Sequence, residues 1–348
     1  MLISLTLLFC ISCQFVDAES IHLLLRRSAL KQYVGQIGLG SSQQLFVVLI
    51  DTKSPIFWVP SVWAPPNTWP GHSKYDPGAS IYHVPSPRQF TIKYPTGYLA
   101  GLVALDQLTV TRRTVPSIRF GHATTVTTEN ALVHQYEGVL GLAPKGGEAP
   151  FDETLLDQME TVESIKEKLF TLVFCRDPEA NYKVGNLTFG EIVREQHVGT
   201  IDYVQSFTEE VWSFVITRVS VGNVIVKDLA AVVAIDSTKP HILGPSDIIL
   251  AIHQGLSFLS EENGLYRVDC SLLNSLRDLV FHVGEKELRL SVEDYVTQTV
   301  TQGVLHCYSA LKHNPSSRRW IFGIPFLQGF FTVFDQGRKL LGFAKPNC

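Results

Sequence analysis

Short runs of β-branched and aromatic residues alternate with Gly, Pro, Asn and Asp along most of the chain, at intervals of about ten residues. Because runs of this kind are typical of strands joined by turns, the sequence predicts an all-β protein. Short helices are expected only near residues 153–160 and 246–254. The clearest predicted strands span 33–40, 45–50, 101–111, 169–174, 211–222 and 330–334.

Two segments of the chain share one pattern in register. Residues 50–61 (IDTKSPIFWVPS) align without a gap with residues 235–246 (IDSTKPHILGPS), and each segment follows a hydrophobic strand. A second feature recurs later in each half, two apolar residues and a glycine at 139–141 and 321–323. The alternative is a chance similarity between two turn sequences, but chance would not be expected to repeat two features in register. The repeat therefore predicts two lobes of similar plan, each with one aspartate at a strand end.

The two repeated aspartates, Asp51 and Asp236, suit acid–base chemistry if the lobes bring them together. Like charges a few ångströms apart repel, so such a pair shares one proton. One carboxylate then acts as a base towards water, and the other acts as an acid towards a carbonyl. This plan hydrolyses an amide without a metal, a cofactor or a covalent intermediate, and we expect neither metal nor cofactor.

Five segments resemble the pepsin-like aspartic endopeptidases and together cover nearly all of the chain after residue 18. The resemblance implies a bilobal pepsin-like aspartic protease fold with a central cleft and a shared interlobe sheet. It implies an N-terminal lobe at 19–190 and a C-terminal lobe at 191–348. The matching segments are 33–63 (first active-site strand and loop), 92–101 (flap), 137–143 (first apolar–apolar–Gly), 234–240 (second active-site loop) and 320–344 (C-terminal region).

The resemblance implies roles for residues in both active-site loops. Asp51 and Asp236 would be the catalytic pair. The hydroxyls of Thr52 and Ser237 would cross-link the two loops beneath the aspartates, and the Ser54 hydroxyl would hydrogen-bond Asp51. A purely structural role, as core and turn residues, would account for Thr52 and Ser237 equally well.

The flap of the family would be formed here by Tyr94, Thr96 and Gly97, which would line the substrate cleft. Trp58 would support Tyr94 through its indole. Pro95 departs from the family, which has glycine after the flap tyrosine. Because proline has no N–H, a backbone donor that would hold the substrate is lost.

Three further departures fall in the active-site loops. Lys53 and Thr238 replace the glycine of each Asp-Thr/Ser-Gly motif, and glycine suits a place where backbone approaches a ligand closely. Lys239 replaces the hydroxyl residue that normally bonds Asp236. A cation beside the pair also favours ionised carboxylates, which works against proton sharing.

These departures lead to two main functional hypotheses. The first is a pepsin-like homologue with little or no proteolytic activity that retains a cleft for a peptide or protein ligand. The alternative is an active aspartic-type acid endopeptidase that hydrolyses peptide bonds with the Asp51/Asp236 pair. A purely structural role with an unused cleft is a third possibility. Acid digestion of an unfolded protein substrate distinguishes the first two.

Residues 1–18 form an apolar run with small residues at Val16 and Ala18, as in a cleaved signal peptide; a buried strand is the alternative. The run is shorter than the ~20 residues of a spanning helix, and no later stretch could cross a bilayer. We therefore expect a secreted protein, with a lysosomal or other endomembrane compartment as the alternative. Residues 19–32 resemble the start of the family's inhibitory prosegment, joined directly to the enzyme body.

Four cysteines follow the predicted signal peptide: Cys175, Cys270, Cys307 and Cys348. They allow three pairings, and their spacing contains no CxxC pair of the kind that zinc sites use. The family resemblance places a disulfide between Cys270 and Cys307, which leaves the other two as a pair. Asn186 begins an Asn-Leu-Thr glycosylation motif, for which a surface loop is expected.

Charge and length exclude other classes. The chain has 348 residues, which suggests about two domains. Its 29 Lys and Arg residues nearly balance 33 Asp and Glu residues, and no basic stripe appears. We therefore expect no nucleic-acid partner and no anionic membrane partner.

Overall fold

A computed structural model describes most of the chain after the predicted signal peptide. The signal peptide, Pro95 and Thr96 lie outside the described residues, so predictions about them stay predictions. Each of the six predicted strands overlaps an observed strand, which confirms the all-β prediction. The described residues are 20–28, 31–94, 97–127, 136–144, 151–175, 184–256, 260–262, 264–314 and 319–348.

Within the described residues, the largest sheet has 13 strands and draws on both halves of the chain. The strands β11, β24 and β23 of the second half continue directly into β9, β10 and β1 of the first half, which confirms the shared interlobe sheet. In spatial order the strands are β11 (His197–Gln205), β24 (Leu340–Pro346), β23 (Phe331–Asp335), β9 (Leu169–Cys175), β10 (Val184–Phe189), β1 (Ile21–Arg27), β2 (Tyr33–Leu39), β3 (Gln44–Asp51), β8 (Val139–Gly141), β4 (Trp58–Pro60), β7 (Arg113–Val126), β6 (Gly97–Val110) and β5 (Val84–Tyr94).

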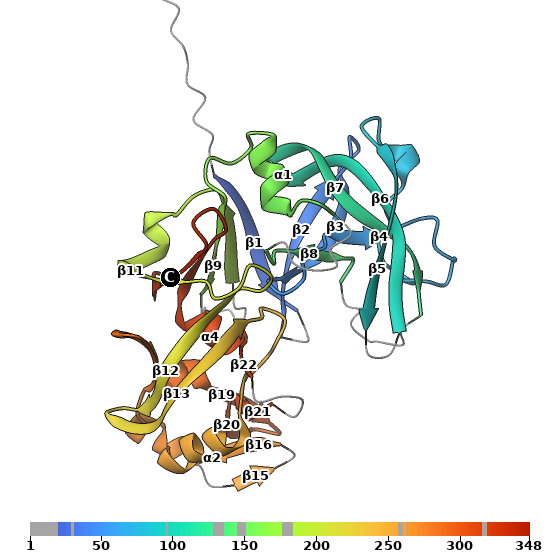
Figure 1. The fold of residues 1–348 in the computed structure, drawn as a ribbon. Helices are drawn as coiled ribbons and strands as arrows, with labels where there is room; N and C mark the ends of the chain where they lie inside the picture. The colour runs from blue at the N-terminus through green and yellow to red at the C-terminus, as the bar shows by residue number, and fades with distance from the viewer. Residues whose placement is uncertain are drawn as a thin grey trace, which may run out of the picture.

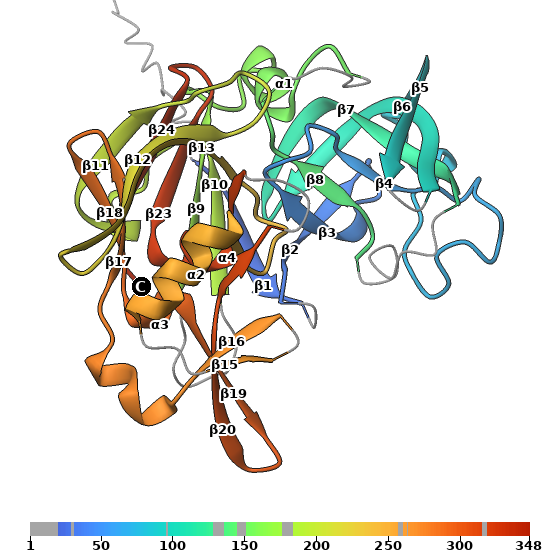
Figure 2. The ribbon, with the colours of Figure 1, turned by 60° about the horizontal axis from the view of Figure 1, so that its bottom comes forward.

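Two further sheets come from the second half alone. Figure 1 shows β2 to β7 on one side of the molecule and β12, β13 and β19 to β22 on the other, with β1 and β9 between them, and Figure 2 shows the same arrangement after a rotation. The bilobal pepsin-like fold is thereby confirmed, while the lobe boundary at residue 190 stays a prediction. The seven-stranded sheet has the order β18 (Lys286–Leu290), β17 (Leu279–Val283), β12 (Ser213–Val221), β13 (Val224–Ile235), β22 (Trp320–Phe322), β14 (Ile242–Gly244) and β21 (Leu311–His313); the four-stranded sheet has the order β15 (Ser260–Glu262), β16 (Leu265–Val268), β20 (Val304–Ser309) and β19 (Val296–Thr301).

Helices are short. Those predicted near 153–160 and 246–254 correspond to the first two α-helices, whereas the other two were not predicted. None of the helices in the described part of the chain has the length and hydrophobicity needed to span a bilayer. The helices are α1 (Leu155–Thr161), α2 (Ser246–Gly255), α3 (Val292–Tyr295) and α4 (Ile324–Gly329), with 3₁₀ turns at η1 (Pro77–Ala79), η3 (Arg194–Gln196) and η4 (Cys270–Ser275).

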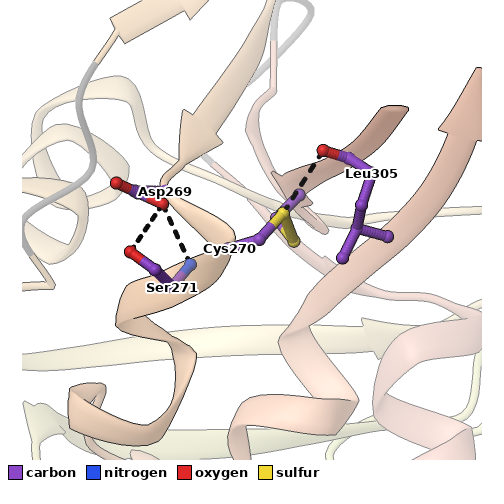
Figure 3. Close-up of a disulfide and its surroundings, with 5 residues drawn as sticks. Asp269, Cys270, Ser271 and Leu305 are labelled. Atoms are coloured by element: carbon purple, nitrogen blue, oxygen red, sulfur yellow. Dashed lines mark hydrogen bonds between the residues drawn. A yellow bond between two sulfur atoms is a disulfide. The ribbon is translucent and has the colours of Figure 1, made fainter. Parts of the chain in front are cut away.

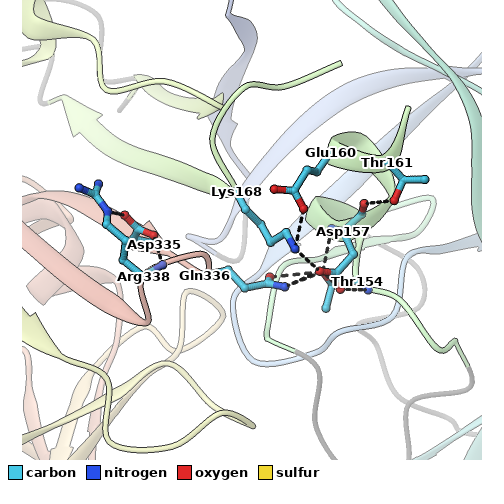
Figure 4. Close-up of polar contacts among 8 residues, drawn as sticks. All are labelled: Thr154, Asp157, Glu160, Thr161, Lys168, Asp335, Gln336 and Arg338. Atoms are coloured by element: carbon cyan, nitrogen blue, oxygen red, sulfur yellow. Dashed lines mark hydrogen bonds and ion pairs between the residues drawn. The ribbon is translucent and has the colours of Figure 1, made fainter. Parts of the chain in front are cut away.

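A polar network ties α1 to the turn between β23 and β24 (Figure 4). Thr154 caps α1 through its hydroxyl, which accepts from the Asp157 N–H at 3.1 Å. The Asp157 carboxylate in turn accepts from the Gln336 side chain at 2.9 Å and pairs with Lys168 at 3.1 Å. Because Gln336 belongs to the C-terminal segment, this network adds a polar link between the first and second halves.

Two disulfides are formed. The Cys270–Cys307 pair implied by the resemblance is confirmed, and the remaining cysteines, Cys175 and Cys348, also pair. Cys270 opens η4, where the Asp269 side chain accepts from the Ser271 N–H and hydroxyl (Figure 3). The Cys175–Cys348 disulfide links the end of β9 covalently to the segment that follows β24, two strands away in the shared sheet.

The expectation of a loop at Asn186 is wrong, because this half-buried residue lies in a strand. Asn186 lies in the interior strand β10, opposite Leu24 of β1 and Val173 of β9. Its side-chain oxygen is buried without a hydrogen-bond partner among the described residues. The three-residue motif carries no information about strand pairing, and a glycan at this position would have to fit against the sheet. Glycosylation at Asn186 stays a prediction.

The strand β1 is an integral part of the shared sheet. It pairs with β10 on one edge and with β2 on the other. Its side chains alternate as a half-buried strand requires: Ile21, Leu23 and Leu25 are buried, whereas Leu24 is 68% exposed. Leu23 packs directly on Gly35, where a Cβ would lie 2.6 Å from a Leu23 methyl group.

Replacing Leu23 by alanine should therefore lower the free energy of unfolding by about 2–5 kcal/mol, because it leaves a cavity between the strands. The matched change Leu24→Ala, one residue along the same strand, should lower it by less than about 0.5 kcal/mol. Urea unfolding followed by tryptophan fluorescence measures both. Equal effects of the two changes would show that β1 is not buried in the shared sheet.

Candidate active site

The two aspartates occupy equivalent places in the two halves. Asp51 ends β3, which runs parallel to β8, and Asp236 directly follows β13, which runs parallel to β22. The repeated glycines lie where the active-site loops cross these strands. A Cβ on Gly141 would lie 2.5 Å from the backbone nitrogen of Ile56, and a Cβ on Gly323 would collide with backbone carbonyls of the second loop. The sequence repeat is therefore a repeat of backbone crossings that only glycine permits.

Reciprocal hydrogen bonds join the two loops directly beneath the aspartates. The Thr52 N–H donates to the Ser237 hydroxyl at 3.0 Å, and the Ser237 N–H donates to the Thr52 hydroxyl at 3.0 Å. Each hydroxyl then donates to a carbonyl of the opposite half, Thr52 to Ile235 and Ser237 to Ile50. Both side chains are fully buried. The predicted cross-link thus forms with these two residues, and it holds Asp51 and Asp236 near each other.

The carboxyl of Asp51 is held by its own loop. Its Oδ1 accepts from the backbone N–H groups of Lys53 at 2.8 Å and Ser54 at 3.1 Å. The expected hydrogen bond from the Ser54 hydroxyl to Asp51 is not formed. Ser54 contacts Asp51 through its backbone N–H, and its hydroxyl accepts from the Ile56 N–H instead.

The pKa of Asp51 is raised from 3.8 to about 6. Burial is the largest cause, and the neighbouring charge of Asp236 adds to it. The two backbone donors and the Lys53 ammonium oppose this rise but are outweighed. The expectation that lysines would keep the carboxyls readily ionised is therefore wrong for Asp51, because burial and like charge dominate.

The carboxyl of Asp236 has different partners. It is 1% exposed, and its Oδ1 accepts from both the N–H of Thr238 at 3.0 Å and the hydroxyl of Thr238 at 2.6 Å. Its Oδ2 is buried and has no hydrogen-bond partner among the described residues, while the Lys53 Nζ lies 3.8 Å away. The first loop thus extends a cation towards the aspartate of the second loop.

Thr238 has a role that the sequence did not predict. It was expected to crowd the floor of the cleft in place of glycine, and the loss of a hydroxyl at Lys239 was expected to leave Asp236 unsupported. The Thr238 hydroxyl supplies that bond from one residue earlier. Lys239 instead fixes the loop through its backbone, whose carbonyl accepts from the Ile324 N–H at 2.8 Å.

The flap corresponds to the hairpin of β5 and β6, where Tyr94 pairs with Gly97. Gly97 has φ +155°, and a Cβ there would lie 2.9 Å from the Thr127 hydroxyl, so glycine is required. The predicted support of Tyr94 by Trp58 stays a prediction, since the Tyr94 side chain lies outside the described residues. Trp58 itself is buried in β4 beside Trp69, with ring centroids 6.4 Å apart.

The described residues include no cluster of three or more His, Cys, Asp or Glu side chains that could hold a metal ion.

Comparison with known proteins identifies the family. A model described as eukaryotic aspartyl protease matches residues 32–346. The chain is 28% identical to chymosin of Callithrix jacchus over 315 residues, which cover 90% of this chain and 81% of that protein. It is 27% identical to cathepsin E of Mus musculus over 322 residues (90% and 80%), and 30% identical to cathepsin D of Dictyostelium discoideum over 320 residues (90% and 83%).

The raised pKa of Asp51 predicts a pH-dependent stability. The folded protein keeps this proton to a higher pH than the unfolded chain, so stability falls as pH rises from about 4 to about 6. Asn at this position accepts the same two backbone bonds but cannot ionise. Across that range, the wild type should lose about 2 kcal/mol of unfolding free energy relative to Asp51→Asn. Chemical denaturation at several pH values measures this, and parallel pH profiles for the two proteins would contradict it.

Proposed function

This chain belongs to the eukaryotic aspartyl protease family, and we propose that it is a member with little or no proteolytic activity that binds peptides in its cleft. The proposed cleft lies between lobes 19–190 and 191–348. The Asp51/Asp236 pair forms its floor, and the flap residues Tyr94, Thr96 and Gly97 cover it.

The observation that carries this proposal is the Lys53 ammonium, 3.8 Å from Asp236 Oδ2. A hydrolytic pair needs one proton and one negative charge shared around a water molecule. A cation at this distance stabilises the negative charge on Asp236 by up to about 4 kcal/mol, and by less here because Lys53 is half exposed. It therefore holds the charge on one carboxyl, whereas a hydrolytic pair shares it. It also occupies space beside the oxygen that would hold the water.

Thr238 supports the same conclusion. Its hydroxyl makes the bond to Asp236 Oδ1 that the family's hydroxyl residue normally makes, but it does so from the position where the family has glycine. The side chain also adds volume where the family has only glycine backbone. Together with Pro95, which has no N–H to offer a substrate, these residues weaken both catalysis and substrate positioning.

The alternative is an active acid endopeptidase, and one observation favours it. The loops are cross-linked by Thr52 and Ser237, and the pKa of Asp51 is about 6. A carboxyl that retains its proton in mild acid is the state that a proton-sharing pair requires. The two hypotheses therefore differ in whether Lys53 and Thr238 prevent turnover.

We also propose entry into the secretory route through a signal peptide at residues 1–18. Two disulfides fit an oxidising compartment, where such bonds persist. Secretion is the proposed endpoint, with a lysosomal or other endomembrane compartment as the alternative.

Digestion of an unfolded protein between pH 3 and pH 7 tests the function. The wild type should show negligible cleavage. The quadruple variant Lys53→Gly, Thr238→Gly, Lys239→Thr, Pro95→Gly should gain about 10²-fold in acid activity, because the pair can then share a proton and hold water.

Adding Asp51→Ala to the quadruple variant should abolish the gained activity, which assigns it to the pair. Strong cleavage by the wild type that Asp51→Ala removes would overturn the proposal and establish the acid endopeptidase.

A further inference from the structure

Lysines from three separate segments surround the loop that carries Asp236. Lys239 belongs to the loop, and Lys312 lies on β21, opposite Leu243 of the adjacent strand β14. Lys31 lies in the turn between β1 and β2. Its neighbour Gln32 donates from its side chain to the Thr238 carbonyl at 3.3 Å, so this turn contacts the loop directly.

The imidazole of His241 lies close enough to Lys31 and Lys312 to be affected by their positive charges. Its pKa is lowered to about 4, chiefly by burial and then by the positive charges of Lys312 and Lys31. Arg27 adds a further cation, since its Nε donates to the Lys31 carbonyl at 3.4 Å. Across the described residues, none of the three lysines, at positions 31, 239 and 312, forms an ion pair with an acidic side chain. The charge is therefore uncompensated in a protein whose net charge is −4.

Unpartnered polar atoms lie within this set of residues. Gln32 is 7% exposed, and its side-chain oxygen has no hydrogen-bond donor among the described residues. The Nδ1 of His241 is also buried without a partner in the described part of the chain. Both atoms are buried within the protein, so the contacts of a bound ligand are left to the lysine side chains.

We propose that the site prefers acidic peptides, whose Asp or Glu side chains contact Lys31, Lys239 and Lys312 while the peptide backbone lies along the Asp236 loop. This inference rests on the proposed peptide-binding function and specifies its ligand. Lys53 is not part of the preference, because it is already paired with Asp236.

Fluorescence anisotropy with the full secreted chain tests the preference. The probes are a labelled ten-residue peptide of alternating Glu and Thr, the same peptide with Gln in place of Glu, and a single-stranded oligonucleotide of equal charge. In low salt the Glu peptide should bind at least about ten-fold more tightly than the Gln peptide. Raising the salt to about 0.5 M should remove most of this difference, because it shortens the screening length.

The double variant Lys31→Gln, Lys312→Gln should weaken binding of the Glu peptide about five-fold and leave the Gln peptide unchanged. The matched control is Lys227→Gln, Lys345→Gln, which removes two exposed lysines from β13 and β24 and should change neither affinity. Unchanged thermal unfolding of both variants shows that they remain folded.

Equal affinity for the Glu and Gln peptides would overturn the acidic preference while leaving the peptide-binding function intact. Binding of neither peptide would overturn the peptide-binding function itself. Equal losses in the two double variants, or equally tight binding of the oligonucleotide, would show general attraction of anions and would also overturn the inference.

Discussion

The active-site region depends on the reciprocal hydrogen bonds between Thr52 and Ser237. Each residue directly follows an aspartate, so these bonds fix where both carboxyls lie. Both hydroxyls are fully buried, and each one accepts an N–H and donates to a carbonyl of the opposite half. Losing one hydroxyl would leave an unpaired N–H on the opposite loop, at a cost of about 1–3 kcal/mol. The bonds thus stabilise the fold whether or not the site is catalytic.

Several features could be predicted from the sequence because they follow from backbone constraints. The repeat around Asp51 and Asp236 reflects crossings at Gly141 and Gly323 that admit no Cβ. Runs of β-branched and aromatic residues bounded by turn residues located the six clearest strands. The short helices α3 and α4 were missed, since four to six residues carry too little periodicity to distinguish them from turns.

Other features depend on where side chains point after the two halves meet. Nothing in the local sequence indicates that the Thr238 hydroxyl faces back to Asp236, or that Lys53 extends across to the other loop. The loop expected at Asn186 was wrong for a similar reason: its motif is three residues long, whereas its place in a strand depends on pairing with β1 and β9. The predicted effect of lysine charge on Asp51 failed because burial, which no motif encodes, is the larger influence.

The charges of the site suggest why the fold tolerates the loss of the family's glycines. Two buried carboxyls are unfavourable unless a proton or a cation reduces their repulsion. In a hydrolytic pair the shared proton has this role, and the same proton is used in the reaction. Here Lys53 places a cation beside Asp236 while Asp51 retains a raised pKa, so repulsion is reduced from both sides. Unlike a shared proton, the charge of the lysine stays on one side of the pair. Under the proposed function, the lysine that stabilises the pair is also the residue that disfavours turnover.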